Sequence, residues 1–211
     1  MAKGNNREAK TLSEAEQRRL DRFEKLAEDM QRQGYTRRDL TIDMGKANRF
    51  AIILMIVLLA VGFGAYYLVH RKLEFSGANP LILLAVLVVL IVVHELIHGI
   101  CWSVFTPRHF KDIEFGIMKP SMTPYCACLV PLKKGQHIFG TVMPLVVLGI
   151  IPMIVGIAVG NPGVLFIGIV MSASAAGDIL IIENLLAYRS SAREVVYMDH
   201  PTDAGGVVFE R

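Results

Sequence analysis

The stretch LILLAVLVVLIVVHELIHGI, residues 81–100, is apolar from Leu81 to Val93 and then carries two histidines and a glutamate within five residues. An apolar run of this length is typical of a helix that crosses a bilayer, for which about 20 residues are needed. Ionisable side chains inside such a helix are costly in lipid and mark functional sites. The stretch therefore predicts a transmembrane helix with a chemical site near one end.

Apolar runs of spanning length occur four times along the chain, at residues 50–69, 81–105, 139–159 and 164–188. The third run contains Pro144 and Pro152, which predict a kinked helix, because proline lacks the backbone N–H that a helix interior uses. Hydrophobic residues make up 53% of the 211 residues, more than is usual for a soluble domain. We therefore expect an all-α membrane protein with four transmembrane helices, in contact with the lipid bilayer.

The net charge of +3 gives no sign of a nucleic-acid partner. Lysines and arginines gather in three segments: residues 1–48, the loop 106–138 and the tail 189–211. Positive charge is enriched in cytoplasmic loops, so both termini and the long loop are expected in the cytoplasm. The charge density of residues 1–48 also argues against a secretory signal peptide. We expect a multi-pass protein of the cell membrane.

Residues 1–48 are expected to be a polar region that contains one soluble helix. Ser13 and Glu16 have the spacing of a capping box, and Gly34 is suited to the C-terminal end. Between them an apolar stripe recurs at helical spacing, formed by Leu20, Phe23, Ala27 and Met30. This stripe is expected to lie on the membrane surface, on the rest of the chain or on a partner; the alternative is a mostly solvated helix.

The loop between the second and third spans has the pattern of strands. Residues 112–118 alternate between apolar and polar side chains, residues 125–132 are a second extended candidate, and KPSMTP at 119–124 is turn-like. We expect a small β-hairpin in this cytoplasmic loop; a simple amphipathic connector is the alternative. The predicted organisation is then a cytoplasmic region at 1–48, a transmembrane domain at 49–188 and a cytoplasmic tail at 189–211.

His94, Glu95 and His98 form the pattern H-E-x-x-H. Residues four apart lie on one face of a helix, so both imidazoles can reach one ion. In zinc hydrolases with this pattern the glutamate acts as general base. The spacing therefore predicts a Zn²⁺ site with Glu95 next to it.

A catalytic zinc site needs a third protein ligand, and the candidates are Asp178, Glu183, His109, His137, Glu114 and the cysteines. Counted along their helices at about 1.5 Å per residue, Asp178 and His94 lie at nearly the same depth, while Glu183 lies about 7 Å nearer the cytoplasm. The small residues 172–177 before Asp178 allow close helix packing. Asp178 is therefore preferred; Glu183 remains an alternative ligand, and Glu183 and Asn184 are candidates for polar groups around the site.

HELIHG on one transmembrane helix, with GD on a later one, resembles the intramembrane zinc metalloproteases of the site-2 protease type. A closer resemblance is to a family of prokaryotic membrane proteins described as zincin peptidases, which share HELxHG, a hairpin-like loop, a proline-containing third span and a late GD. The resemblance covers residues 81–188 and implies His94, His98 and Asp178 as zinc ligands. It also implies Glu95 as the catalytic base. The context AAGDILII departs from the L-D-G context of site-2 proteases, so their substrate-handling motif is not carried over.

These observations predict a zinc-dependent endopeptidase in the membrane, in which Glu95 activates a zinc-bound water. Its partner would be a polypeptide substrate, expected to be a membrane or membrane-associated protein. The alternative is a non-catalytic membrane adaptor or scaffold with a structural metal site, although such a site has no need of Glu95. A metal or proton transporter ranks last, because the first and third spans offer no polar path.

Overall fold

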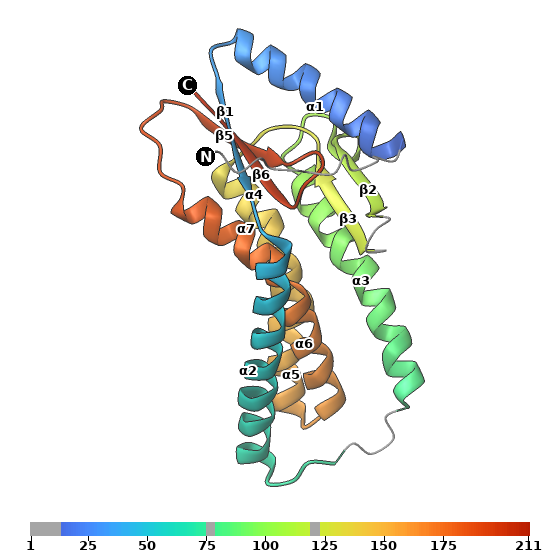
Figure 1. Ribbon diagram of the computed structural model, residues 1–211. Helices are drawn as coiled ribbons and strands as arrows, with labels where there is room; N and C mark the ends of the chain where they lie inside the picture. Colours follow the sequence, from blue (N-terminus) through green and yellow to red (C-terminus); the bar gives the residue numbers. More distant parts are fainter. Residues whose placement is uncertain (1–13, 75–78, 119–122) are drawn as a thin grey trace, which may run out of the picture.

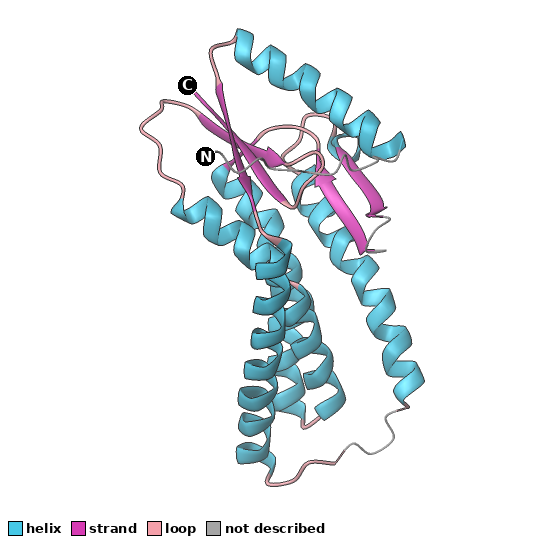
Figure 2. Ribbon diagram, viewed as in Figure 1, coloured by secondary structure: helices cyan, strands magenta, loops and turns pink. Residues whose placement is uncertain are grey.

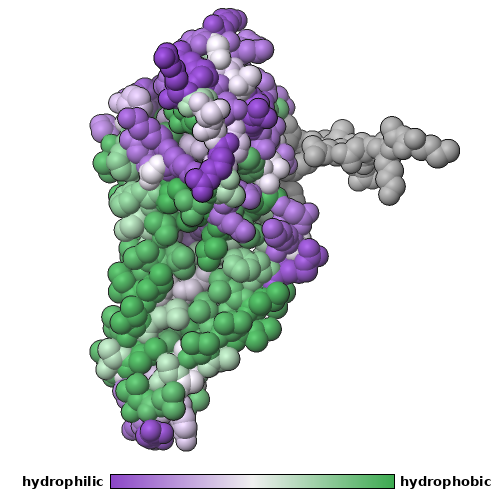
Figure 3. Space-filling model, turned by 90° about the vertical axis from the view of Figure 1, so that its left-hand side faces the viewer, coloured by the Kyte–Doolittle hydropathy of each residue, from purple (hydrophilic) through white to green (hydrophobic). Residues whose placement is uncertain are grey.

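The computed structural model describes residues 14–74, 79–118 and 123–211. The molecule is mainly helical, with a long apolar part and a polar part that contains two small antiparallel sheets (Figures 1 and 2). Figure 3 shows hydrophobic residues over the helical part and hydrophilic residues over the part that carries the sheets. The mainly helical fold of the prediction is confirmed; one of the two sheets is the predicted hairpin, and the four-stranded sheet is an addition to the expected fold class.

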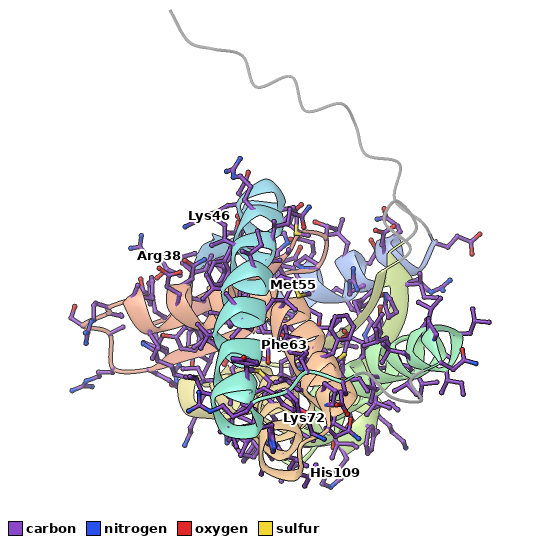
Figure 4. All side chains as sticks on the ribbon, turned by 90° about the horizontal axis from the view of Figure 1, so that it is seen from below. Arg38, Lys46, Met55, Phe63, Lys72 and His109 are labelled. Carbon is purple, nitrogen blue, oxygen red and sulfur yellow. The ribbon has the colours of Figure 1, made fainter. Side chains whose placement is uncertain are left out.

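By length and composition, three helices of the described residues are suited to crossing a membrane: α2 (Met44–His70), α3 (Pro80–Ser103) and the helix from Lys134 to Val159. The last of these runs through α4 (Lys134–Pro144), a π-helical segment η2 (Leu145–Ile150) and α5 (Ile151–Val159). The π segment directly follows Pro144, so the predicted irregularity takes this form. In Figure 4, Lys46 lies toward one end of α2 and Lys72 beyond the other, with Met55 and Phe63 between them.

The run at 164–188 is not one straight helix. It forms α6 (Pro162–Ser174) and α7 (Ala176–Ala187), which are bent by 47° at Ala175 and count as one span only if the bent pair is taken together. Ala175 has φ −78° and ψ 11°, outside the α-helical region. The break places Asp178 in the first turn of α7.

The helix ends follow the local sequence. The Asn79 side chain caps α3 by accepting from the Leu81 amide at 2.9 Å, and Asn161 caps α6 in the same way. Pro80 and Pro162 occupy the first helical position, where a missing N–H costs nothing. These signals define where both helices begin.

α3 has two different halves. Its first half projects away from α2, α5 and α6 (Figures 1 and 4), and Leu81, Ile82 and Leu84 are each more than half exposed. Its second half is buried against α4 and the hairpin, and Trp102 is only 4% exposed. The H-E-x-x-H motif begins where the helix enters this packed region.

A four-stranded antiparallel sheet in the order β1-β6-β5-β4 joins distant parts of the chain. Its strands are β1 (Thr36–Thr41), β6 (Gly205–Glu210), β5 (Val195–Asp199) and β4 (Leu132–Lys133). The segment at 189–211, expected only as a tail, thus supplies two of the four strands. This sheet was not predicted, because β1 pairs with residues at the far end of the chain, Thr36 opposite Glu210.

The amphipathic helix α1 (Glu14–Arg32) covers this sheet (Figure 1). Phe23 and Met30 of the predicted stripe are buried with Val207 and Phe209 of β6. Of the three predicted docking surfaces, the rest of the chain is therefore the one observed. Ser13 of the predicted capping box lies outside the described residues.

The predicted hairpin is present as β2 (Ile113–Met118) and β3 (Thr123–Cys128), preceded by a 3-10 turn η1 (His109–Asp112). Its turn at 119–122 lies outside the described residues. The hairpin packs on α3 at Gly99, where an added Cβ would lie 3.2 Å from Ile113 Cγ2 and overlap the Phe115 ring. The absence of a side chain at Gly99 thus allows the hairpin to lie directly beside the histidine motif.

Candidate metal centre

His94 and His98 lie one turn apart on the packed half of α3. Both are buried, and their Nε2 atoms are 3.2 Å apart. The i, i+4 spacing places both rings on the same side of the helix, as the motif predicts.

Asp178 meets these two rings from the first turn of α7. Its Oδ2 lies 3.1 Å from His94 Nε2 and its Oδ1 lies 3.5 Å from His98 Nε2. One ligand atom from each residue lies within 4.8 Å of the others, and among the described residues this is the one group of three or more such side chains. The structure thus brings together the three residues that were predicted to bind zinc.

The donor set fits a zinc ion. His98 Nδ1 donates to the Gly140 carbonyl oxygen at 2.9 Å, so in a neutral ring Nε2 presents a lone pair to His94 and Asp178. Three ligands at about 2.0–2.2 Å from one tetrahedral zinc are separated by roughly 3.3–3.6 Å, close to the separations observed. His94 Nδ1 is buried and has no hydrogen-bond partner in the described part of the chain.

Glu95 lies beside this cluster and lines a cavity of about 490 Å³. The backbone amide of Cys126 in β3 lies next to the Glu95 carboxylate. The cavity is also lined by His98, Asp178 and residues of β3, the start of α2 and the β5–β6 turn. A ligand in this cavity would therefore contact the histidine motif and strand β3 at the same time.

Trp102 packs against the face of the His98 ring. The indole and imidazole rings are stacked, with centroids 5.1 Å apart and an interplanar angle of 13°. Trp102 Nε1 donates to the His137 carbonyl oxygen at 3.1 Å. A Cβ at Gly140 would overlap the indole, so glycine is needed there for α4 to approach this closely.

Two further residues of the cavity wall are His137, one of the candidate ligands, and Asp199, which was not predicted to belong to the site. His137 is 1% exposed, and its Nε2 lies 3.2 Å from Asp199 Oδ1 and not at the metal cluster. Asp199 ends β5, and its Oδ2 accepts from the Cys128 amide at 2.7 Å. The one sequence signal for Asp199 is an acidic residue that closes a short β-branched run, which is too common to indicate a site.

The other ligand candidates lie elsewhere. Glu183 is exposed on α7 and Asn184 is half-buried, and neither lines the cavity. His109 Nδ1 bonds to the Ser103 carbonyl at 3.0 Å, and Glu114 accepts from the Tyr125 hydroxyl.

The two cysteines of β3 are unsuited to metal binding for a different reason, the raised pKa of their thiols. Burial, followed by the nearby Asp199 carboxylate, raises the pKa of the Cys128 thiol to about 12, and the same causes raise the pKa of Cys126. A thiol must lose its proton to bind a metal, so both cysteines are poor ligands at neutral pH.

No curated protein and no solved structure matches this chain. Residues 87–193 match the family described as "Putative zincin peptidase". The matched segment is just over half of the chain and contains His94, Glu95, His98 and Asp178. The name zincin implies zinc, in agreement with the donor set at the cluster. Since the match extends over this much of the chain, the protein belongs to the zincin peptidase family.

Proposed function

We propose that this protein is a membrane-embedded zinc endopeptidase that hydrolyses peptide bonds of membrane or membrane-associated proteins. The observation that carries the proposal is the meeting of His94, His98 and Asp178 beside Glu95. Of these residues, Glu95, His98 and Asp178 line one cavity. The first three side chains would hold the ion through two imidazole nitrogens and a carboxylate oxygen. A bound zinc would supply Lewis-acid chemistry, since it lowers the pKa of a water molecule and polarises a carbonyl group.

Glu95 is the proposed general base. Its carboxylate takes the proton of the attacking water and later delivers it to the leaving amine. The Cys126 amide lies beside this carboxylate and would help to orient it. Trp102 and the Gly140 carbonyl hold His98 from the two sides that do not face the cluster.

Strand β3 supports a proposal for how the substrate is held. Four of its consecutive residues, Pro124 to Ala127, line the cavity, on the side of β3 that has no partner strand. A helical substrate has to unwind before its backbone can be attacked, and an unwound segment can add to a strand edge through main-chain hydrogen bonds. Such a segment would run past Glu95 along β3.

The exposed first half of α3 supports a membrane substrate. Its apolar side chains are exposed over several turns and are not covered by another helix of the described residues, and the cluster lies at the end of this stretch. The basic residues of the N-terminal segment, the hairpin loop and the C-terminal segment support a cytoplasmic position for the sheets and both termini. We propose that residues 49–188 form the transmembrane zinc metalloprotease domain.

The test compares Glu95→Gln with wild type and with Glu183→Gln, a matched change at an exposed carboxylate of α7. Each is produced in membranes of the same host, and protein fragments are compared by quantitative proteomics. We expect fragments that depend on wild type and on Glu183→Gln but are absent with Glu95→Gln, which retains zinc. Identical fragments in all three would contradict the peptidase proposal and favour a scaffold with a structural metal.

A further inference from the structure

Asp199 lies outside the segment that matches the family, yet its carboxylate joins two elements beside the metal cluster. Its Oδ1 bonds to His137 Nε2 of α4 at 3.2 Å, and its Oδ2 accepts from the Cys128 amide of β3 at 2.7 Å. Its side chain is 15% exposed. Beside the pairing of β5 with β4, this carboxylate therefore adds a side-chain link between the C-terminal hairpin β5–β6 and the cavity wall.

His137 has no ring nitrogen left for a substrate or a metal. His137 Nδ1 lies 3.3 Å from Thr141 Oγ1, whose hydrogen is donated to the His137 carbonyl at 2.8 Å. His137 Nε2 bonds to Asp199, and the side chain is almost fully buried. The bonds of His137 thus hold α4 in place and do not reach into the cavity.

The same turn of α4 controls His98. The His137 carbonyl receives the Trp102 indole N–H, and the Gly140 carbonyl receives His98 Nδ1–H. Trp102 in turn stacks on the His98 ring. A shift of this turn would therefore move both groups that orient His98.

We propose that Asp199 is a positioning residue of the metal centre: by anchoring His137, it holds the turn of α4 that orients Trp102 and His98. The C-terminal hairpin thereby sets the affinity of the cluster for its metal. Partners that orient a histidine ligand are worth about 10–100-fold in metal affinity. This inference rests on the proposed zinc site, but not on peptidase activity.

The test uses the full-length protein, purified in detergent, with Asp199→Asn as the nearly isosteric change. An amide has one acceptor oxygen, so it cannot accept from both the Cys128 amide and His137. Zinc affinity is measured by competition with a chelator, and we expect it to fall about 10-fold. Trp102 is the only tryptophan in the chain, so intrinsic fluorescence reports the ring that stacks on His98. We expect its emission to shift in the metal-free variant and its quenching by Co²⁺ to weaken.

Glu194→Gln is the matched control, since it removes the same charge from the same hairpin and does not line the cavity. The Glu194 side chain is 48% exposed and pairs with Arg211 at 2.8 Å. We expect wild-type zinc affinity and Trp102 emission in this variant. Equal unfolding temperatures of the two metal-free variants would show that a loss in Asp199→Asn is local to the centre.

Wild-type zinc affinity together with wild-type Trp102 emission in Asp199→Asn would overturn the inference, as would a wild type that binds no zinc. Failure of the proposed function gives a different result: zinc binding that depends on Asp199, without fragments that depend on Glu95. If Asp199→Asn does not fold, His137→Leu, which has no donor for Asp199, cuts the same link from α4 and is expected to weaken zinc binding to a similar extent. Unchanged zinc affinity in His137→Leu would then overturn the inference.

Discussion

Two groups of histidine and aspartate lie at the same cavity, with Trp102 between them. In the group of His137 and Asp199, donors meet acceptors: the Cys128 amide and the His137 ring both face the carboxylate. In the group of His94, His98 and Asp178, the His98 lone pair faces another imidazole nitrogen and a carboxylate. The same residue types thus form a closed hydrogen-bond network at Asp199 and a convergence of hydrogen-bond acceptors at Asp178. The second group is short of hydrogen-bond donors, and this is what suits it to a metal ion.

The largest effect is expected from removing a ligand from the group of His94, His98 and Asp178. Asp178→Ala removes one of three ligands, so we expect the zinc content to fall from one per chain to almost none after dialysis. Metal analysis of the purified protein measures this, with Glu183→Ala as the control on the same helix. Full zinc content in Asp178→Ala, or its loss in Glu183→Ala, would show that the depth comparison chose the wrong carboxylate.

A smaller effect is expected from Gly140→Ala, which disturbs Trp102, the residue that lies between the two groups. Its Cβ would overlap the Trp102 indole, and such overpacking typically costs about 1–3 kcal/mol of stability. Thermal unfolding in detergent measures the loss. Gly135→Ala, at a position of the same helix with no atom within 4 Å of the new Cβ, is the control. Equal unfolding temperatures of the two variants would mean that Trp102 can move aside freely.

The smallest effect at neutral pH is expected at the Cys128 thiol, next to the hydrogen-bond network of His137 and Asp199. Because the pKa of Cys128 is raised to about 12, its thiol stays protonated at pH 8, and iodoacetamide should label it far more slowly than in the unfolded chain. The pKa of the Cys128 thiol is higher in the folded than in the unfolded chain, where it is about 8.5. The contribution of this thiol to the free energy of unfolding is therefore complete below about pH 8.5 and is lost as the pH rises toward 12. Peptide mass spectrometry across this range measures labelling. Rapid labelling of the folded protein at pH 8 would contradict the burial argument.

Much of the site was predictable from local patterns. The spacing of His94 and His98 and the depth of Asp178 place these three side chains together, as the structure does. The hairpin at 113–128 was predictable because its alternation and its prolines lie within one short loop.

Other features depend on contacts that no local pattern contains. The pairing of Thr36 with Glu210 joins opposite ends of the chain, and each strand alone is too short to indicate its partner. The break at Ala175 lies in a run of small residues that suits a continuous helix equally well. The place of Asp199 beside the site follows only from the sheet that carries it.

The unpaired side of β3 has a consequence for association between copies of this protein. An open strand edge is a template on which another chain can build a sheet, and proteins commonly block such edges. Here Pro124 has no N–H to offer, Asp199 accepts from the Cys128 amide, and the Cys126 amide lies beside Glu95. This edge therefore offers few donors to a strand of another copy, while its carbonyl oxygens can still accept from the N–H groups of an unwound substrate.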